Sequence, residues 1–365
     1  MIAGVRDGRV AAMVSYDAIA DLTLHVEDYA LEGRKRAITE EFVRATTIVH
    51  LRGDRLQGRG EDVVYDADLQ RAQVQAGPRL ELAGEWTLDS FSRHLETLDL
   101  FDRQDLGVDA WRRYRRWAFE SAAADLALRQ AGRPLSEALG RAPRPLDFVV
   151  STGLGSPPSL APVTDRIGAY PGVRFKLDSH PAWDEALIAA LADTGAVAQI
   201  DFKGTYKGEW VDWETDPVLY ARCAEAFPDA WLEDPDLTVP EADAALEPHR
   251  DRITWDEPIH GVADLEALPF PPRAINVKPS RIGSWRELFA VYAWCAERGI
   301  RCFGGGQSEL GVGRGQIQLL AALFHPEEPN DVAPPGWDHR EFPSTGLPVS
   351  PLSPEPDATG FARRS

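Results

Sequence analysis

The second half of the chain repeats one pattern, in which a short apolar run is followed by residues with helical spacing. Seven such runs follow the proline-rich segment RAPRPL. Strands that alternate with helices at this rhythm form βαβ units, and these units form a parallel sheet. Seven units favour a closed barrel over an open sheet, with a weak eighth strand near NDVAP. The predicted strands lie in LDFVVSTG, VRFKLD, VAQIDF, AWLEDP, ITWDEPI, AINVKPS and RCFGGG.

The first part of the chain has a different pattern of apolar residues. Apolar alternation in residues 18–64 predicts strands, with TTIVHLRG the clearest of them. Residues 111–132 have apolar side chains at helical spacing and end on a glycine, which is typical of a helix C-terminus. We therefore expect an α+β domain over residues 1–143 and a barrel over residues 144–337. The tail, residues 338–365, is expected to complete the first domain.

Charge and composition narrow the partners of the chain. A net charge of −19 disfavours nucleic acid and anionic membranes, because both repel an acidic surface. No stretch reaches the ~20 apolar residues of a membrane span, and the first residues lack the apolar core of a signal peptide. Cys223, Cys295 and Cys302 form no CxxC motif and no even set, which is typical of reduced thiols. We expect a soluble cytoplasmic protein that acts on a small molecule.

Charged residues stand at the ends of five consecutive predicted strands. The carboxyl ends of the strands carry the chemistry in a parallel barrel, and these residues are spaced about one βα unit apart. Any one of them alone could be an ordinary surface residue that follows its strand. Charged residues at five consecutive strand ends are not expected by chance, because strand ends would otherwise carry mixed residue types. The series is Lys176, Asp201, Glu233, Asp256 and Lys278.

Three carboxylates that converge repel one another unless a cation lies among them. Oxygen ligands with open positions suit Mg²⁺, and the lack of histidine at these strand ends argues against zinc. A desolvated lysine near a divalent cation has a lowered pKa and can act as a general base. The metal would hold a substrate carboxylate and stabilise the enolate that forms when a base removes the adjacent proton. Two opposed bases permit racemisation, whereas one base suits β-elimination or cycloisomerisation.

Several strings along nearly the whole chain, taken in order, resemble the enolase superfamily in its muconate-lactonising subgroup. Two of them, a glycine–glutamate loop and a long helix with a G-x-P-L ending, lie in the first domain, and five lie in the barrel. No histidine–aspartate dyad, which would mark the mandelate-racemase subgroup, is visible late in the barrel. The strings are GRGEDVVYD, AFESAAADLALRQAGRPLSEALG, RFKLD, QIDFKG, WLEDPDL, ITWDEPI and INVKPSRIGS.

This resemblance implies a modified (β/α)7β TIM-type barrel, an N-terminal α+β capping domain and one essential Mg²⁺. By position, it implies that Asp201, Glu233 and Asp256 bind the metal. It also implies that Lys176 and Lys278, on the second and sixth strands, are the acid/base pair. Barrels of this family often form homo-oligomers, so the resemblance is also compatible with a homo-oligomer.

Two positions depart from the pattern of the family. The usual Lys-x-Lys of the second strand reads Arg174-x-Lys176 here. Strand alternation puts Arg174 on the face of Lys176, where its permanent charge would lower the pKa of the lysine. The usual Asp-x-Asn of the third strand reads Asp201-x-Lys203. We expect Lys203 to reach either the substrate carboxylate or an oxygen atom of a metal ligand.

Other polar residues near the strand ends have weaker signals. The segment GGGQSELGVGRG opens a helix, and its amides could cradle a carboxylate or phosphate, or simply form a tight turn. Within this segment Gln307 or Glu309 is the candidate for a polar residue of the seventh strand. Glu257 alternates to the face opposite Asp256, so we expect it beside a lysine or at a helix end.

These observations favour a Mg²⁺-dependent enzyme that removes the α-proton of a carboxylate substrate. Racemisation or epimerisation of an acyl-amino acid or dipeptide ranks first, because both lysines are present. Dehydration of the o-succinylbenzoate synthase type, or cycloisomerisation, ranks second. Two readings of another class remain: a Schiff-base aldolase with Lys278 as nucleophile, and a non-catalytic homologue.

Overall fold

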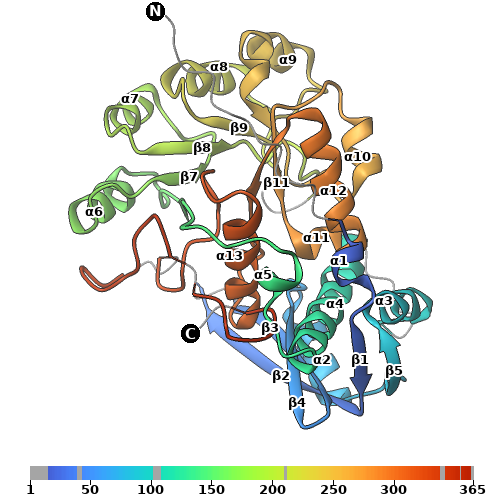
Figure 1. Ribbon diagram of the computed structural model, residues 1–365. Coiled ribbons are helices and arrows are strands. Elements are labelled where there is room, and N and C mark those ends of the chain that lie inside the picture. Colours follow the sequence, from blue (N-terminus) through green and yellow to red (C-terminus); the bar gives the residue numbers. More distant parts are fainter. Residues whose placement is uncertain are drawn as a thin grey trace, which may run out of the picture.

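The protein has two parts, a β/α barrel and an α+β capping domain (Figure 1). This is the architecture that the sequence predicts. The structure is a computed structural model that describes residues 15–38, 43–101, 108–208, 212–337, 342–353 and 355–362.

The barrel strands are parallel, and each of the seven predicted apolar runs contains one of them. Five of them pair in the order β10-β9-β8-β7-β6, and β11 pairs with β12. All of them are short. Their bounds are β6 (Val150–Thr152), β7 (Phe175–Asp178), β8 (Val197–Asp201), β9 (Trp231–Glu233), β10 (Ile253–Thr254), β11 (Ala274–Val277) and β12 (Arg301–Gly304).

Two sets of contacts close the barrel. The Asn276 amide donates a 3.0 Å hydrogen bond to the Trp255 carbonyl, which links β11 to the end of β10. On the other side, Asn330 pairs with Phe148 and the next residue pairs with Gly305, both in parallel. Residues 330–331 therefore stand between β12 and β6 as the eighth strand. The weak strand predicted near NDVAP is confirmed at this position.

Helices surround the barrel strands (Figure 1). Most of them follow one strand and precede the next, as in a chain of βαβ units. Their bounds are α6 (Ala161–Ala169), α7 (Glu185–Asp193), α8 (Pro217–Ala226), α9 (Pro240–Leu246), α10 (Val262–Ala267), α11 (Pro279–Ile282), α12 (Trp285–Arg298) and α13 (Val312–Phe324), with a 3₁₀ turn at Glu247–Arg252 after α9.

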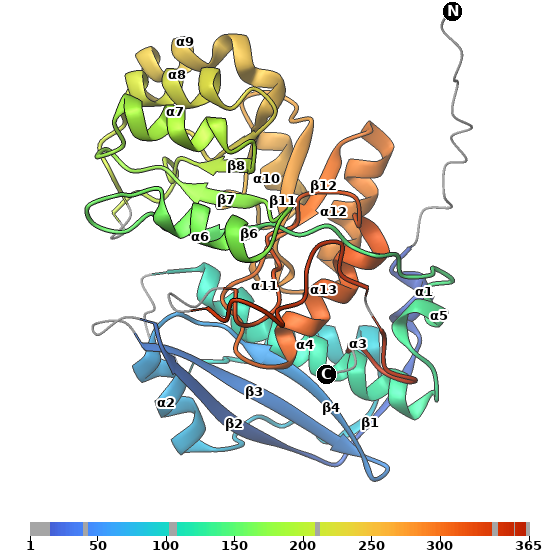
Figure 2. The same cartoon turned by 90° about the vertical axis from the view of Figure 1, so that its left-hand side faces the viewer.

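The capping domain is an antiparallel sheet, β2-β3-β4, with the long helix α4 packed on it (Figure 2). The helix predicted over residues 111–132 corresponds to α4. A second pair of strands, β1 and β5, lies beside it. The bounds are α1 (Asp17–Ala20), β1 (Thr23–Val26), β2 (Asp28–Ala37), β3 (Val43–Gly53), β4 (Leu56–Asp62), α2 (Ala67–Ala76), β5 (Gly84–Thr87), α3 (Leu88–Thr97), α4 (Ala110–Gln130) and α5 (Leu135–Ala138).

Two glycines of β4 permit the close approach of α4. A Cβ atom at Gly60 would collide with the Ala118 carbonyl oxygen, and one at Gly58 would collide with the Ala122 carbonyl oxygen. Both obstacles are backbone atoms, which cannot turn aside as a flexible side chain can. The glycines of the GRGEDVVYD string therefore have a packing role.

Replacing Gly60 by alanine should destabilise the protein, because sheet and helix must separate to admit the new methyl group. We expect the free energy of unfolding in urea to fall by about 3 kcal/mol. A matched control is Gly168→Ala in α6, where an added Cβ meets no atom within 4 Å. The control should be as stable as the parent or slightly more stable. Equal stability of the two variants would contradict this account.

The C-terminal segment contacts both parts of the molecule. Leu352 and Leu146 exchange backbone hydrogen bonds of 2.7 and 2.9 Å at the start of the barrel. Further along, the Phe361 amide donates a 2.7 Å hydrogen bond to Asp125 of α4, and the Phe361 ring packs on Trp285 of α12. The segment thus ties helix α4 to the barrel.

A buried histidine supports the closure of the barrel. His325 Nδ1 lies 2.6 Å from Asn330 Oδ1, and His325 Nε2 lies 3.1 Å from the hydroxyl of Tyr292. Asn330 Oδ1 also accepts a hydrogen bond from the Gly304 amide of β12. These contacts fit a neutral ring that donates from Nδ1. Burial lowers the pKa of His325 to about 4.

This lowered pKa predicts a specific loss of stability in acid. Below the ordinary histidine pKa of ~6.5 the unfolded chain binds a proton that the folded chain does not, so stability falls as the pH falls toward 4. We expect a contribution of about 3 kcal/mol, lost between about pH 6.5 and 4. A His325→Gln variant should lose less stability over this window in urea titrations. The same pH dependence in both proteins would contradict the assignment.

None of the helices in the described part of the chain combines the length and apolar character that a membrane span requires.

Candidate active site

The barrel brings the five charged residues of the predicted series to one end. Lys176 lies in β7, Asp201 and Glu233 end β8 and β9, and the other two follow β10 and β11. Because parallel strands share one carboxyl rim, the side chains meet there. The exposed fractions of Lys176, Asp201, Glu233, Asp256 and Lys278 are 2%, 0%, 0%, 1% and 8%. Such burial of charge requires close partners of opposite sign.

Lys176 contacts two of the carboxylates. Its ammonium group donates a hydrogen bond to Glu233 Oε1 and lies 3.0 Å from Asp201 Oδ2 and 4.0 Å from Asp331 Oδ2. Burial lowers the pKa of Lys176, but Asp201 and Glu233 outweigh burial and raise it well above its ordinary value. The lowered pKa predicted from the sequence is therefore not found in the protein alone. A lowered pKa of Lys176 would require a divalent cation that offsets the negative charge of the same carboxylates.

Lys278 belongs to a second cluster, which is centred on Asp256. Lys278 Nζ lies 2.7 Å from Asp256 Oδ2, and Arg281 Nη1 lies 2.6 Å from Asp256 Oδ1. The Tyr206 hydroxyl donates to Asp256 Oδ2 at 3.2 Å and accepts from Arg281 Nη2 at 3.3 Å. Burial raises the pKa of Asp256, but Arg281 and Lys278 outweigh burial and hold it below its usual range.

Arg281 and Tyr206 were missed as site residues by reasoning from the sequence. Arg281 follows Lys278 by three residues across the short helix α11, so helical spacing could have placed both on one face. Tyr206 stands in the loop after β8, where no periodic pattern exists. Only the folded loop shows that its hydroxyl reaches Asp256.

Asp234 joins Asp201 and Glu233 in a group of three carboxylates. One oxygen atom of each lies within 4.8 Å of the others, and all three side chains are buried. Strand alternation would turn Asp234 away from Glu233, but its φ of 49° interrupts the strand. The oxygen atoms of Asp234 accept hydrogen bonds of 2.8 and 2.9 Å from the amides of Asp256 and Glu257. Asp256 is thus linked to the group through its backbone.

The chemistry of this group fits a hard divalent cation. Burial, followed by the charges of Asp256 and Asp201, raises the pKa of Asp234 to about 7. The pKa of Glu233 also lies well above its ordinary value because of burial, although Lys176 opposes the shift. A cation held by these oxygen atoms would relieve the repulsion. The assignment of Asp201, Glu233 and Asp256 as ligands stays a prediction, and Asp234 is a further candidate.

Arg174 lies outside the site, contrary to the expectation that it shares a face with Lys176. It is exposed, whereas Phe175 and Lys176 are both buried. Arg174 precedes β7, which begins at Phe175, so the alternation of side chains within the strand does not extend to it. Arg174 therefore does not supply the positive charge that the sequence pattern suggested.

Lys203 lies inside the site, next to Asp201. Its ammonium group is 2.5 Å from Asp201 Oδ2 and 3.3 Å from Asp178 Oδ1, and it lies 5.1 Å from the centre of the Tyr206 ring. Lys203 has a φ of 56°, so it is not a regular strand residue. Of the two contacts expected for this lysine, the structure shows the one with a carboxylate of the predicted metal site.

The remaining candidates lie around the rim. Gln307 accepts a hydrogen bond of 3.1 Å from the Tyr65 hydroxyl and donates one of 3.0 Å to the Tyr114 hydroxyl, so it faces the capping domain. Glu309 Oε2 lies 3.0 Å from Nη2 of Arg314, in the first turn of α13. The side chain of Glu257 is half-buried.

The segment GGGQSELGVGRG does cradle a carboxylate, and this carboxylate belongs to the protein itself. Glu61 of β4 accepts hydrogen bonds from the amides of Leu310 (2.6 Å), Gly311 (3.0 Å) and Gly313 (2.9 Å) at the start of α13. Nearby, Arg44 donates to the Gln307 carbonyl at 2.8 Å. These contacts hold the capping domain over the carboxyl end of the barrel.

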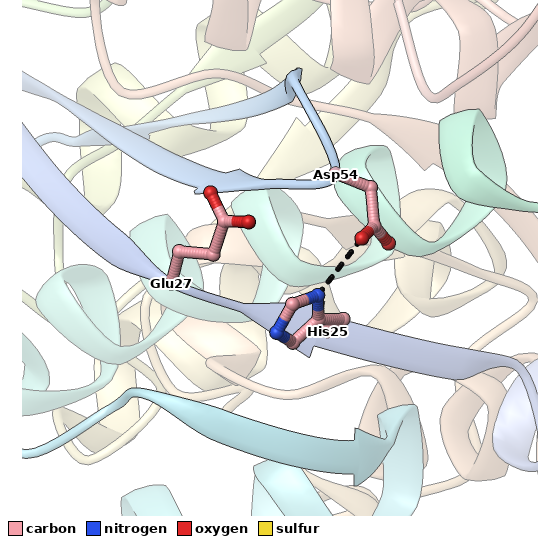
Figure 3. Close-up of side chains that lie close together, drawn as sticks. All are labelled: His25, Glu27 and Asp54. Carbon is pink, nitrogen blue, oxygen red and sulfur yellow. Dashed lines mark hydrogen bonds and ion pairs between the residues drawn. The ribbon is translucent and has the colours of Figure 1, made fainter.

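A second group of possible metal ligands lies on the capping domain. Figure 3 shows His25, Glu27 and Asp54, which are half-buried or exposed. His25 Nδ1 lies 2.9 Å from Asp54 Oδ1, and this hydrogen bond is the main cause of the raised pKa of His25. A surface ion pair accounts for this arrangement, so the buried carboxylates remain the better candidates for a metal site.

Two family models together match most of the chain. The model described as "Domain of unknown function (DUF8230) N-terminal domain" matches residues 17–138, and the one for the C-terminal domain matches residues 142–339. Among curated proteins, an o-succinylbenzoate synthase of Geobacillus stearothermophilus is 29% identical over 59% of this chain and 58% of its own length. An N-succinylamino acid racemase of Thermus thermophilus is 27% identical over 80% of this chain and 78% of its own. This chain thus spans less than two thirds of the synthase.

Solved structures share the fold at low identity. A dipeptide epimerase from Methylococcus capsulatus, complexed with Mg ion, has a TM-score of 0.64 at 20% identity, over 84% of this chain and 90% of that one. A putative mandelate racemase/muconate lactonizing enzyme from Sorangium cellulosum has a TM-score of 0.68 at 18% identity, over 93% and 99% of the chains.

Proposed function

This chain belongs to the DUF8230 family within the enolase superfamily, and we propose that it is a metal-dependent enzyme acting on a small carboxylate substrate. In the proposed reaction a lysine removes the proton next to that carboxylate. The observation that carries the proposal is the placement of the two buried lysines. Lys176 lies on the second strand of an eight-stranded barrel and Lys278 follows the sixth, so they stand on opposite sides of the carboxylates.

The residues of the chain have separate roles in this proposal. Asp201, Glu233 and Asp256 would hold one Mg²⁺, with Asp234 as the alternative third ligand. When bound, the cation would orient the substrate carboxylate and offset the negative charge that develops as the proton leaves. Lys176 and Lys278 would take the proton from one face and return one to the other.

Racemisation or epimerisation of an acyl-amino acid or dipeptide is the form of the reaction that we favour. A lysine on each side lets either configuration lose its proton, which a dehydration does not require. The relatives named N-succinylamino acid racemase and dipeptide epimerase support this choice. Dehydration is the second candidate, supported by the relatives named o-succinylbenzoate synthase.

The test is proton exchange with the solvent. The protein is incubated in D₂O with Mg²⁺ and a panel of N-acyl amino acids, dipeptides and sugar acids. The masses of these compounds are then measured. We expect deuterium at the α-carbon of one class, with inversion if the enzyme is a racemase. A Schiff-base aldolase would instead keep its activity after chelation and be modified at Lys278 by borohydride with substrate. Mg²⁺ binding without any exchange would favour a non-catalytic homologue.

A further inference from the structure

Lys203 holds both oxygen atoms of Asp201. Its backbone amide donates a 3.0 Å hydrogen bond to Oδ1, and its ammonium group lies 2.5 Å from Oδ2. Because Asp201 is fully buried, this cation compensates a charge that would otherwise be costly to desolvate. A divalent ion that binds Asp201 must therefore contend with an ammonium group that is already there.

Asp178 offers the same ammonium group a second partner. Asp178 ends β7 directly beside Asp201 at the end of β8, and its Oδ1 atom lies 3.3 Å from Lys203 Nζ. The side chain of Asp178 is 47% exposed, and Asp178 does not belong to the group of three carboxylates that could hold a metal ion. It can therefore keep the lysine paired without taking part in cation binding.

On the basis of the proposed function, we propose that Lys203 competes with the divalent cation for Asp201 and that Asp178 holds the ammonium group when the cation binds. Two cations at one carboxylate oxygen repel each other strongly in a buried site. The ammonium group can relieve this repulsion by a small movement, because both aspartates are already within reach of it. Lys203 then weakens cation binding, and Asp178 limits that weakening.

This arrangement predicts opposite effects for the two partners. Lys203→Met removes the competitor, so the affinity for a divalent cation should rise by about tenfold or more. Asp178→Asn removes the alternative partner and leaves Lys203 on Asp201, so the affinity should fall by about tenfold. In the double variant the competitor is absent, so the Asp178→Asn substitution should change the affinity by less than about twofold.

The probe is Mn²⁺, titrated into the full chain and followed by the electron paramagnetic resonance signal of the free ion. This readout requires no substrate and no activity. The matched control is Lys207→Met, since Lys207 stands in the same loop but is half-exposed and pairs with Asp236 at 2.8 Å. It removes the same charge and should leave the Mn²⁺ affinity within about twofold of the parent. Thermal unfolding without metal checks that each variant is folded.

The possible results separate the inference from the proposed function. Tighter binding by Lys203→Met, with an Asp178→Asn effect that vanishes in the double variant, supports the inference. Unchanged or weaker binding by Lys203→Met overturns it, even if the parent binds Mn²⁺ and catalyses exchange. An Asp178→Asn effect that persists in the double variant overturns the role of Asp178. If no variant binds Mn²⁺, the proposed metal site fails, and this inference fails with it.

Discussion

Replacing Lys176 and Lys278 together by alanine should lower the rate of α-proton exchange by at least about 10⁴-fold, since each general base contributes about 10²- to 10⁴-fold. Both ammonium groups lie within hydrogen-bond reach of the carboxylates that would hold the metal, at 3.0 and 2.7 Å. The measurement is deuterium incorporation into the substrate class found with the parent protein.

The single variants should separate the two faces of the substrate. If each lysine serves one face, each single alanine variant should lose exchange for one configuration and retain some exchange for the other. Lys207→Ala is the control, because this exposed lysine lies away from the buried site. Since Lys176→Ala leaves Asp201 and Glu233 with fewer partners, Mn²⁺ binding by the variant should be verified first. Exchange that persists in the double variant would show that other residues act as the bases.

Replacing Glu233 by glutamine should remove both cation binding and activity. Glu233 is fully buried and contacts Lys176, and its Oε2 atom accepts a 3.3 Å hydrogen bond from the side-chain amide of Asn276. The substitution keeps the shape of this side chain and deletes its charge. We expect Mn²⁺ affinity to fall by at least about 100-fold, because a hard cation prefers a charged oxygen ligand. Chelation of the parent protein should abolish exchange to the same extent.

The control for this variant is Glu327→Gln, which removes one charge from an exposed ion pair with Arg144. It should bind Mn²⁺ as the parent does. Asp256→Asn and Asp234→Asn, compared under the same conditions, identify the third ligand. A larger loss for Asp234→Asn would replace Asp256 in the proposed set. Full binding by Glu233→Gln would refute the metal site at the end of β9.

Much of the fold follows from patterns that are local in the chain. Each predicted barrel strand contains a strand of the structure because a short apolar run between helices has few other places to be buried. The five charged residues reach one rim because parallel strands all end there, so knowing where each strand ends was enough. The eighth strand was faint in the sequence because it is held by isolated backbone bridges at Asn330 and Asp331 rather than by an apolar run of its own.

The failures concern residues where the backbone leaves regular geometry. Arg174 was assigned to the site by strand alternation, but it precedes the first residue of β7 and its side chain is exposed. Strand alternation would turn Asp234 away from Glu233, whereas its positive φ interrupts the strand and its carboxylate lies beside that of Glu233. Such bends depend on contacts with other strands, and no local pattern encodes them.

The sequence by itself therefore determined the barrel, the capping domain and the identity of the charged residues at the rim. These depend on periodicity and on the spacing of strand ends, which neighbouring residues encode. Only the tertiary structure decided how the charges pair. It places Lys176 against Asp201 and Glu233, sets Lys278, Arg281 and Tyr206 around Asp256, and fills the amide cradle of α13 with Glu61. These pairings join residues far apart in the chain, and their geometry is set by packing and by electrostatic balance in a buried space.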